Sequence, residues 1–172
     1  MTKAPAWTVR HAGPDDASAL ALVGAATFLE TFAGAIDGPA IVAHCAANHA
    51  AESYAGLFAK GAQAWLGEVE GGAPVGYALI AKPELDAARP GDIELKRIYT
   101  LSRYHGSGLG GAMMAAAVAG ASGHERLLLG VKADNHRAIA FYRKQGFDPI
   151  ATRQFNVGGK LYDDLVLARP LA

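Results

Sequence analysis

Three features are scarce in this sequence: cysteine, net charge and long apolar runs. Its 172 residues contain one cysteine, Cys45, which excludes an internal disulfide and favours a reducing, cytoplasmic location. Sixteen basic and sixteen acidic side chains cancel, so no electrostatic feature predicts a nucleic acid or an anionic membrane as partner. No run reaches the roughly eighteen apolar residues of a membrane-spanning helix, and the N-terminal stretch lacks the apolar core of a signal peptide. We therefore expect a cytoplasmic protein.

The length of the chain fits one domain with a sizeable core, expected to span residues 1–172. Apolar periodicity and glycine or proline breaks predict a strand at 7–10, helices at 14–33, 40–47 and 51–60, and a hairpin of strands at 62–69 and 75–81. They then predict a central strand at 92–101, a helix at 112–121, a strand at 126–131, a helix at 135–145 and strands at 147–156 and 160–168. This order predicts an α/β fold with a mixed sheet.

The stretch from Asp92 to Gly111, DIELKRIYTLSRYHGSGLGG, organises the rest of the chain. Its first half is rich in β-branched, aromatic and aliphatic residues, which favour a strand. Its GSGLGG end is too rich in glycine for a helix interior and precedes a helix expected from Ala112. Free backbone N–H groups at a helix start, beside the positive end of the helix dipole, form an anion site that a pyrophosphate can approach closely. The alternative is a flexible loop without a ligand.

Two other phosphate-binding motifs fit this loop less well. GSGLGG matches the dinucleotide pattern G-x-G-x-x-G, but that pattern belongs in a first βα turn with an acidic residue after the next strand. Here the loop lies deep in the chain, and the next apolar run, Leu127–Val131, is followed by Lys132. The Gly-Lys-Ser/Thr sequence of a P-loop is absent.

The glycine loop and a second block downstream carry a family resemblance. Arg103, Gly106 and Gly108 match the pattern of Arg or Gln, two residues, Gly, one residue, Gly or Ala. The second block, LGVKADNHRAIAFYRKQGF, contains six residues at the same family's spacing: Asn135, Ala138, Phe141, Tyr142, Gly146 and Phe147. The chain thus resembles the GNAT superfamily of acyl-CoA-dependent N-acetyltransferases over roughly residues 62–168. The resemblance implies a mostly antiparallel mixed sheet flanked by helices, with acetyl-CoA as co-substrate.

The resemblance also implies which residues contact CoA. A backbone N–H of the central strand meets the thioester carbonyl where that strand splays from its neighbour, and Asn135 contacts the pantetheine arm besides capping its helix. The full candidate set is Ile98, Tyr99, Thr100, Arg103, His105, Gly106, Ser107, Gly108, Leu109, Gly110, Gly111, Asn135, Tyr142 and Lys144. Because His105 and Ser107 stand where basic residues are common, we expect weaker or pH-sensitive CoA binding, compensated by Arg103 and Lys144.

Acetyl transfer to an amine requires a neutral amine. An alkylamine with a pKa of about 10.4 is mostly charged at pH 7, so reaching the neutral form costs roughly 4.6 kcal/mol. Glu94, where several members of the family have a glutamate, is the candidate base, acting directly or through water. Strand alternation predicts one face shared by Glu94, Lys96, Ile98 and Thr100. The alternative is a solvated carboxylate or a partner for Lys96.

The departing thiolate needs a proton, and the resemblance makes Tyr142 its candidate donor. Tyr142 shares a helical stripe with Ala138 and Ile139, so the alternative is a buried aromatic side chain. Cys45 lies outside both blocks, and we therefore expect direct attack in a ternary complex without a covalent intermediate. A nearby trio, His44, Cys45 and His49, matches no zinc spacing, so no metal is expected.

The acceptor is expected to be a small-molecule primary amine. Residues 27–32 (TFLETF) and 94–99 (ELKRIY) resemble PaiA-type polyamine acetyltransferases. The candidate acceptor-site residues are Phe28, Phe32, Glu94, Phe155 and Tyr162. Acetylation of protein N-termini, amino acids or antibiotics remains open, as does a non-catalytic acyl-CoA-binding module. The edge strands of the sheet offer a surface for a homodimer.

Overall fold

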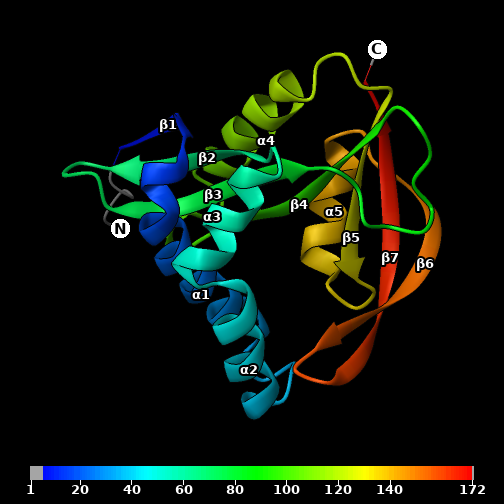
Figure 1. Ribbon diagram of the computed structural model, residues 1–172, viewed down its shortest axis with the longest axis horizontal. Helices are drawn as coiled ribbons and strands as arrows, with labels where there is room; N and C mark the ends of the chain where they lie inside the picture. Colours follow the sequence, from blue (N-terminus) through cyan, green and yellow to red (C-terminus); the bar gives the residue numbers. More distant parts are fainter. Residues whose placement is uncertain (1–5, 172) are drawn as a thin grey trace.

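The computed structural model describes residues 6–171, which form one seven-stranded sheet flanked by helices (Figure 1). The strands are β1 (Trp7–Ala12), β2 (Gln63–Val69), β3 (Pro74–Ala81), β4 (Asp92–Thr100), β5 (Arg126–Lys132), β6 (Asp148–Val157) and β7 (Lys160–Pro170). The helices are α1 (Ala17–Phe32), α2 (Gly38–Asn48), α3 (Ala51–Ala59), α4 (Leu109–Gly120) and α5 (His136–Lys144), with 3-10 turns η1 (Pro14–Asp16) and η2 (Ser102–Tyr104). The sheet order is β1-β2-β3-β4-β5-β7-β6, and of these six pairings the β4–β5 pair is the parallel one. The predicted mixed, mostly antiparallel α/β fold is confirmed.

The sheet carries a separate apolar core on each face. Along β3, Ala78 and Ile80 are buried on the face covered by α4 and α5, whereas Tyr77 and Leu79 are buried on the face covered by α1 and α3. This alternation follows from the period of two in a strand. Because both faces of the sheet are covered at this strand, the sequence of β3 is a nearly continuous apolar run.

The pairing of β3 with β4 contains a β-bulge at Lys96. Leu79 pairs with Arg97 and Ile80 pairs with Leu95, so Lys96 is the extra residue of β4. The bulge reverses the alternation beyond it. Ile98 consequently packs in the α4 and α5 core with Leu95, and the predicted face shared by Glu94, Lys96, Ile98 and Thr100 is wrong.

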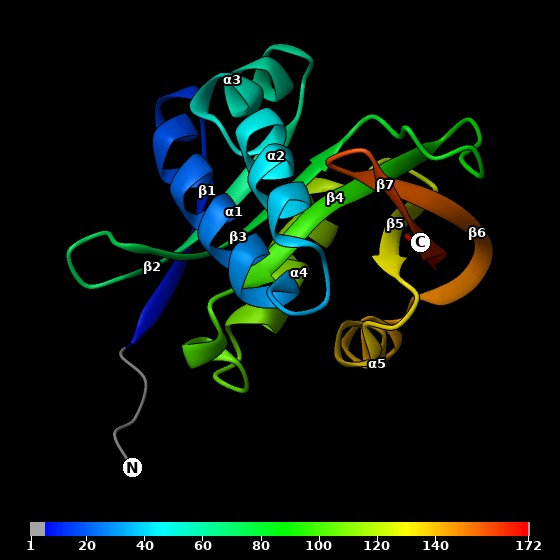
Figure 2. The same ribbon diagram turned by 90° about the horizontal axis from the view of Figure 1, so that it is seen from below.

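The parallel strands β4 and β5 separate after three residue pairs. Asp92, Ile93 and Glu94 pair with β5, and the remaining residues of β4 have no partner in that strand. Figure 2 shows the two strands turning apart, with α5 following the end of β5. The separation leaves an opening in the middle of the sheet.

The far side of this opening is closed by the β6–β7 hairpin, which reaches α2. Val157 of β6 is buried in one cluster with Phe28 of α1 and Ala40 of α2. At the tip, a Cβ added to Gly158 would lie 2.6 Å from the Ala40 Cα, so glycine allows the hairpin to approach the helix.

Two sequence-based boundaries differ from the structure near the glycine loop. Helix α4 begins at Leu109, three residues before the predicted start at Ala112. Gly110 and Gly111 therefore lie in its first turn, where the N–H groups have no partner within the helix. None of the helices within residues 6–171 is long and apolar enough to span a membrane.

Candidate active site

A cavity of about 550 Å³ occupies the opening between β4 and β5. Parts of α1, α2, β4, the glycine loop, α5 and the β6–β7 strands form its wall. The sequence candidates on this wall are Phe28, Phe32, Glu94, Ile98, Tyr99, Thr100, His105, Gly106, Gly108, Gly110, Gly111, Asn135, Tyr142, Phe155 and Tyr162. Segments far apart in the chain thus meet around one space, whose volume suits a small-molecule ligand.

The glycine loop presents its backbone to the cavity at the start of α4. Gly106 and Gly108 have φ angles of 78° and 91°, in the left-handed region that favours glycine. Leu109 N–H donates to Ser107 Oγ at 3.3 Å. Ala112 N–H donates to Gly108 O, which is the first backbone hydrogen bond of the helix. The N–H groups of the first helical turn are consequently available to an anion, as predicted for a pyrophosphate site.

The backbone of β4 offers further donors in the opening. Leu101 N–H donates to Val75 O of β3 at 2.9 Å, and successive N–H groups of a strand point to opposite sides. The N–H groups of Thr100 and Ile98 therefore point away from β3, toward the space that β5 leaves. A donor at this position suits a carbonyl oxygen that gains negative charge during a reaction.

Helix α5 places Asn135 and Tyr142 on the opposite wall. Asn135 caps the helix by accepting a hydrogen bond from Ala138 N–H at 3.3 Å. Tyr142 packs edge-on against Phe147 and is buried, and burial raises the pKa of its hydroxyl well above the ordinary value. The hydroxyl therefore stays protonated at pH 7 and has a proton to donate to a leaving group beside it.

Comparisons with known proteins identify this arrangement. The sequence profile of the Acetyltransferase (GNAT) family matches residues 39–147, more than half of the chain. The chain belongs to the GNAT family. An uncharacterized N-acetyltransferase of Mycobacterium tuberculosis is 34% identical over 158 residues, which cover 91% of this GNAT chain and 98% of the relative.

Solved structures share the GNAT fold over nearly the whole chain. The PaiA N-acetyltransferase of Thermoplasma acidophilum, solved with coenzyme A, has a TM-score of 0.76 at 16% identity and covers 96% of this chain and 99% of its own. The ribosomal-protein-alanine N-acetyltransferase of Brucella melitensis has a TM-score of 0.70 at 25% identity, with coverages of 95% and 99%. The predictions of a GNAT acyltransferase and of acetyl-CoA as co-substrate are confirmed at the level of the family.

Four residues that the GNAT resemblance suggested for CoA lie off the cavity wall: Arg103, Ser107, Leu109 and Lys144. Leu109 is fully buried and packs against Gly67, where an added Cβ would come within 2.8 Å of its side chain. It belongs to the core because helix α4 already begins at this residue. Arg103 and Lys144 are exposed to solvent and lie off the cavity wall, so their contact with CoA stays a prediction.

One cation that contacts the glycine loop of this GNAT protein is Arg137. Its guanidinium contacts Nδ1 of His105 across the mouth of the cavity. The pKa of His105 is lowered, chiefly by burial and then by the charge of Arg137, whereas a hydrogen bond with the Thr100 backbone opposes the shift. His105 is therefore mostly neutral at pH 7, and Arg137 supplies fixed positive charge. Arg137 is not among the residues predicted from the sequence, although it follows the Asn135 cap by two residues.

Glu94, the candidate base, lies at the inner end of the opening. It is 6% exposed, and its Oε2 accepts a hydrogen bond from Glu84 N–H at 2.9 Å. Lys96 lies 3.7 Å from the same oxygen and forms a closer ion pair, 2.8 Å, with the exposed carboxylate of Glu84. Glu94 thus faces the cavity and also contacts Lys96, whereas its burial contradicts the alternative of a solvated carboxylate.

Aromatic side chains form the other end of the cavity. Phe28 stacks on His44 with ring centroids 4.3 Å apart, and His44 meets Phe155 edge-on. Burial lowers the pKa of His44 to about 4, and burial with the charge of Arg97 lowers the pKa of His49 to about 3. Both histidines are neutral at pH 7, so they add no charge to this end of the cavity.

Arg97 is likewise not among the site residues predicted from the sequence. Simple alternation places Arg97 on the same face as Leu95, whereas the bulge at Lys96 turns it to the opposite face, where it lines the cavity. The only local signal is its place between Lys96 and Ile98 in the ELKRIY phrase.

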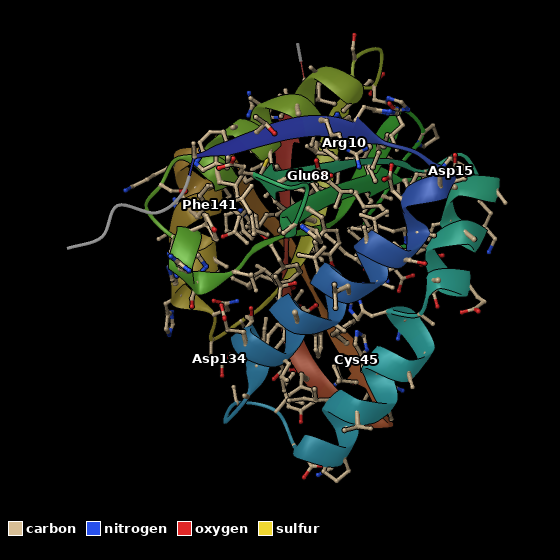
Figure 3. The ribbon with its side chains drawn as sticks, turned by 90° about the vertical axis from the view of Figure 1, so that its left-hand side faces the viewer. Arg10, Asp15, Cys45, Glu68, Asp134 and Phe141 are labelled. Atoms are coloured by element: carbon tan, nitrogen blue, oxygen red, sulfur yellow. The ribbon has the colours of Figure 1, made fainter. Side chains whose placement is uncertain are left out.

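Cys45 is absent from the cavity wall. It packs half-buried against the Phe28 and Val157 cluster, and burial raises the pKa of its thiol. Figure 3 shows Cys45 on α2, well separated from Phe141 of α5. The part of the chain that the structure describes contains no group of three His, Cys, Asp or Glu side chains able to hold a metal.

Proposed function

We propose that this protein acetylates a primary amine of a small molecule by direct attack on acetyl-CoA within a ternary complex. The observation that carries the proposal is the opening between β4 and β5, because it joins the glycine loop, the free N–H groups of β4, Tyr142 and Glu94 in one cavity. A cavity of about 550 Å³ gives both substrates access to the same space.

Three parts of acetyl-CoA, the pyrophosphate, the pantetheine arm and the thioester, have complementary groups in this cavity. The bare N–H groups of Gly110 and Gly111 suit the pyrophosphate, with Arg137 as a nearby cation. Asn135 suits the amides of the pantetheine arm. The N–H of Ile98 or Thr100 suits the thioester carbonyl.

The chemistry forms one C–N bond and breaks one C–S bond. The neutral amine nitrogen attacks the thioester carbon, while a strand N–H stabilises the carbonyl oxygen as it gains charge. Glu94 takes a proton from the amine, directly or through water. The thiolate that departs takes the phenolic proton of Tyr142, and that proton is replaced from solvent. No protein nucleophile is required, which agrees with the position of Cys45 away from the cavity.

The polyamine acceptor that the sequence favoured has no further support. The name of the Brucella melitensis relative indicates a ribosomal protein as its acceptor, and the name of the PaiA relative indicates none. Their low identity supports the fold but not an acceptor. The cavity wall has two carboxylates, Glu84 and Glu94, and both contact Lys96. A polycation would therefore meet little free negative charge.

Initial-rate kinetics test the proposal. CoA release is measured while acetyl-CoA and an amine are varied together, with a panel of polyamines, amino acids, aminoglycosides and short peptides. We expect amine-dependent release with intersecting double-reciprocal lines. Parallel lines would indicate a covalent intermediate and contradict direct attack. If acetyl-CoA binds but no amine of the panel causes CoA release, the result would favour a non-catalytic acyl-CoA-binding module.

A further inference from the structure

We propose that the acceptor amine carries a carboxylate that pairs with Arg97, so that the substrate class is an amino acid or a close analogue. This inference rests on the proposed N-acetyltransferase function and specifies its acceptor. It starts from the one cation on the acceptor side of the cavity that has no carboxylate partner among residues 6–171.

The guanidinium of Arg97 is only partly satisfied by the protein. Its Nη1 donates to Asn48 O at 3.1 Å, and the group lies 5.0 Å from the centre of the Tyr54 ring. A guanidinium has five N–H donors in a fork that matches a carboxylate. Several donors of Arg97 therefore remain for a ligand in the cavity.

Other cations on the wall are already neutralised. The ion pairs are Lys96 with Glu84 at 2.8 Å, Lys132 with Asp134 at 2.6 Å and Arg153 with Asp164 at 3.2 Å. Arg137 lies at the glycine loop against His105, on the side suited to CoA phosphates. Arg97 is therefore the cation on the cavity wall that is left to bind a negatively charged group of the acceptor.

The histidine and tyrosine side chains around Arg97 carry no negative charge at pH 7 that could balance its guanidinium. His44 and His49 are neutral at pH 7, and burial raises the pKa of the Tyr99 hydroxyl to about 12 and also raises that of Tyr54. A partly buried cation without a counter-ion is costly, so binding an anionic group here is favourable.

The position of Arg97 also restricts the shape of the acceptor. It is the residue next to Ile98, whose N–H points into the opening, and both residues line the same cavity of about 550 Å³. An acceptor that places its amine at the thioester and its carboxylate at Arg97 therefore carries both groups on one small molecule. Phe28 and Phe155 line the same end of the cavity and suit an apolar side chain.

Matched substrates test this inference on the wild-type protein. Amine-dependent CoA release is compared for phenylalanine against phenethylamine, leucine against 3-methylbutylamine, and spermidine. We expect each amino acid to exceed its decarboxylated amine in kcat/KM by about tenfold to a hundredfold, the range for a hydrogen-bonded charge pair. Equal values, or a preference for spermidine, would overturn the inference while leaving the acetyltransferase function intact. No release with any amine would contradict both.

Variants at Arg97 then assign the effect to this side chain. Arg97→Gln should raise the KM for the amino acid much more than the KM for the decarboxylated amine, which reduces the preference, and Arg97→Lys should retain part of it. Arg89→Gln, at an exposed position, is the matched control and should keep the wild-type ratio. Equal losses for both substrates in Arg97→Gln would indicate a structural role and overturn the inference. If Arg97→Gln fails to fold, the wild-type ratio and Arg97→Lys still decide.

Discussion

Glu94 of β4 pairs with Leu128 of β5, and this is the last residue pair before the two strands separate. A carboxylate is thereby fixed by regular sheet structure at the point where the cavity begins. Its hydrogen bond from Glu84 N–H holds Oε2 in place. These contacts position Glu94 beside the opening without filling it.

Glu94→Gln should lower turnover by about a hundredfold or more, because it removes the proposed base while keeping the side-chain size. The pH–rate profile should change as well. Without the base, the rate depends on free amine in solution and should keep rising as the pH approaches the amine pKa. Glu84→Gln is the control, since it removes the exposed carboxylate that contacts the same Lys96. Identical pH profiles for Glu94→Gln and the wild type would place the base elsewhere.

Tyr142→Phe should lower kcat by about a hundredfold or more and change the Kd for acetyl-CoA little, because the lost hydroxyl acts on the leaving thiolate. Steady-state kinetics and calorimetric titration measure the two quantities separately. Tyr77→Phe is the matched control, because Tyr77 is fully buried, lies off the cavity wall and has a hydroxyl without a hydrogen-bond partner within residues 6–171. Unchanged turnover in Tyr142→Phe would remove this residue from the acid role.

The free energy of unfolding should fall as the pH drops below about 6.5, the ordinary pKa of histidine. His44 and His49 have folded-state pKa values of about 4 and about 3, so between these values and 6.5 the unfolded chain binds protons that the native protein does not. Each such proton contributes a slope of up to about 1.4 kcal/mol per pH unit. Above pH 6.5 these two groups contribute no pH dependence.

Urea unfolding between pH 7.5 and 5 measures this slope. His49→Gln should flatten it relative to the wild type, whatever its effect on stability at pH 7.5. His124→Gln, at an exposed histidine, should keep the wild-type slope. A wild-type slope in His49→Gln would mean that this histidine is not the source.

The parts of the site that the sequence predicted are those encoded by local patterns. The glycine loop and the Asn135 to Tyr142 block are each continuous in the chain, so spacing alone places them together. Arg97 depends instead on a bulge in the pairing of β3 with β4, and such a change of register has no signature in one sequence. His44 and His49 reach the cavity through tertiary packing of α2 beside α1, which apolar periodicity does not specify. Helix α4 begins three residues earlier than its composition suggested, and the side chain of Leu109 consequently packs in the core.

A crystal structure of the complex with coenzyme A tests the central claim most directly, namely that the opening between β4 and β5 holds the acetyl donor. The prediction is that pyrophosphate oxygens accept hydrogen bonds from the N–H groups of Gly110 and Gly111, and that the sulfur lies beside the Tyr142 hydroxyl. Coenzyme A bound outside this opening, or a sulfur remote from Tyr142, would contradict the proposed site and its chemistry.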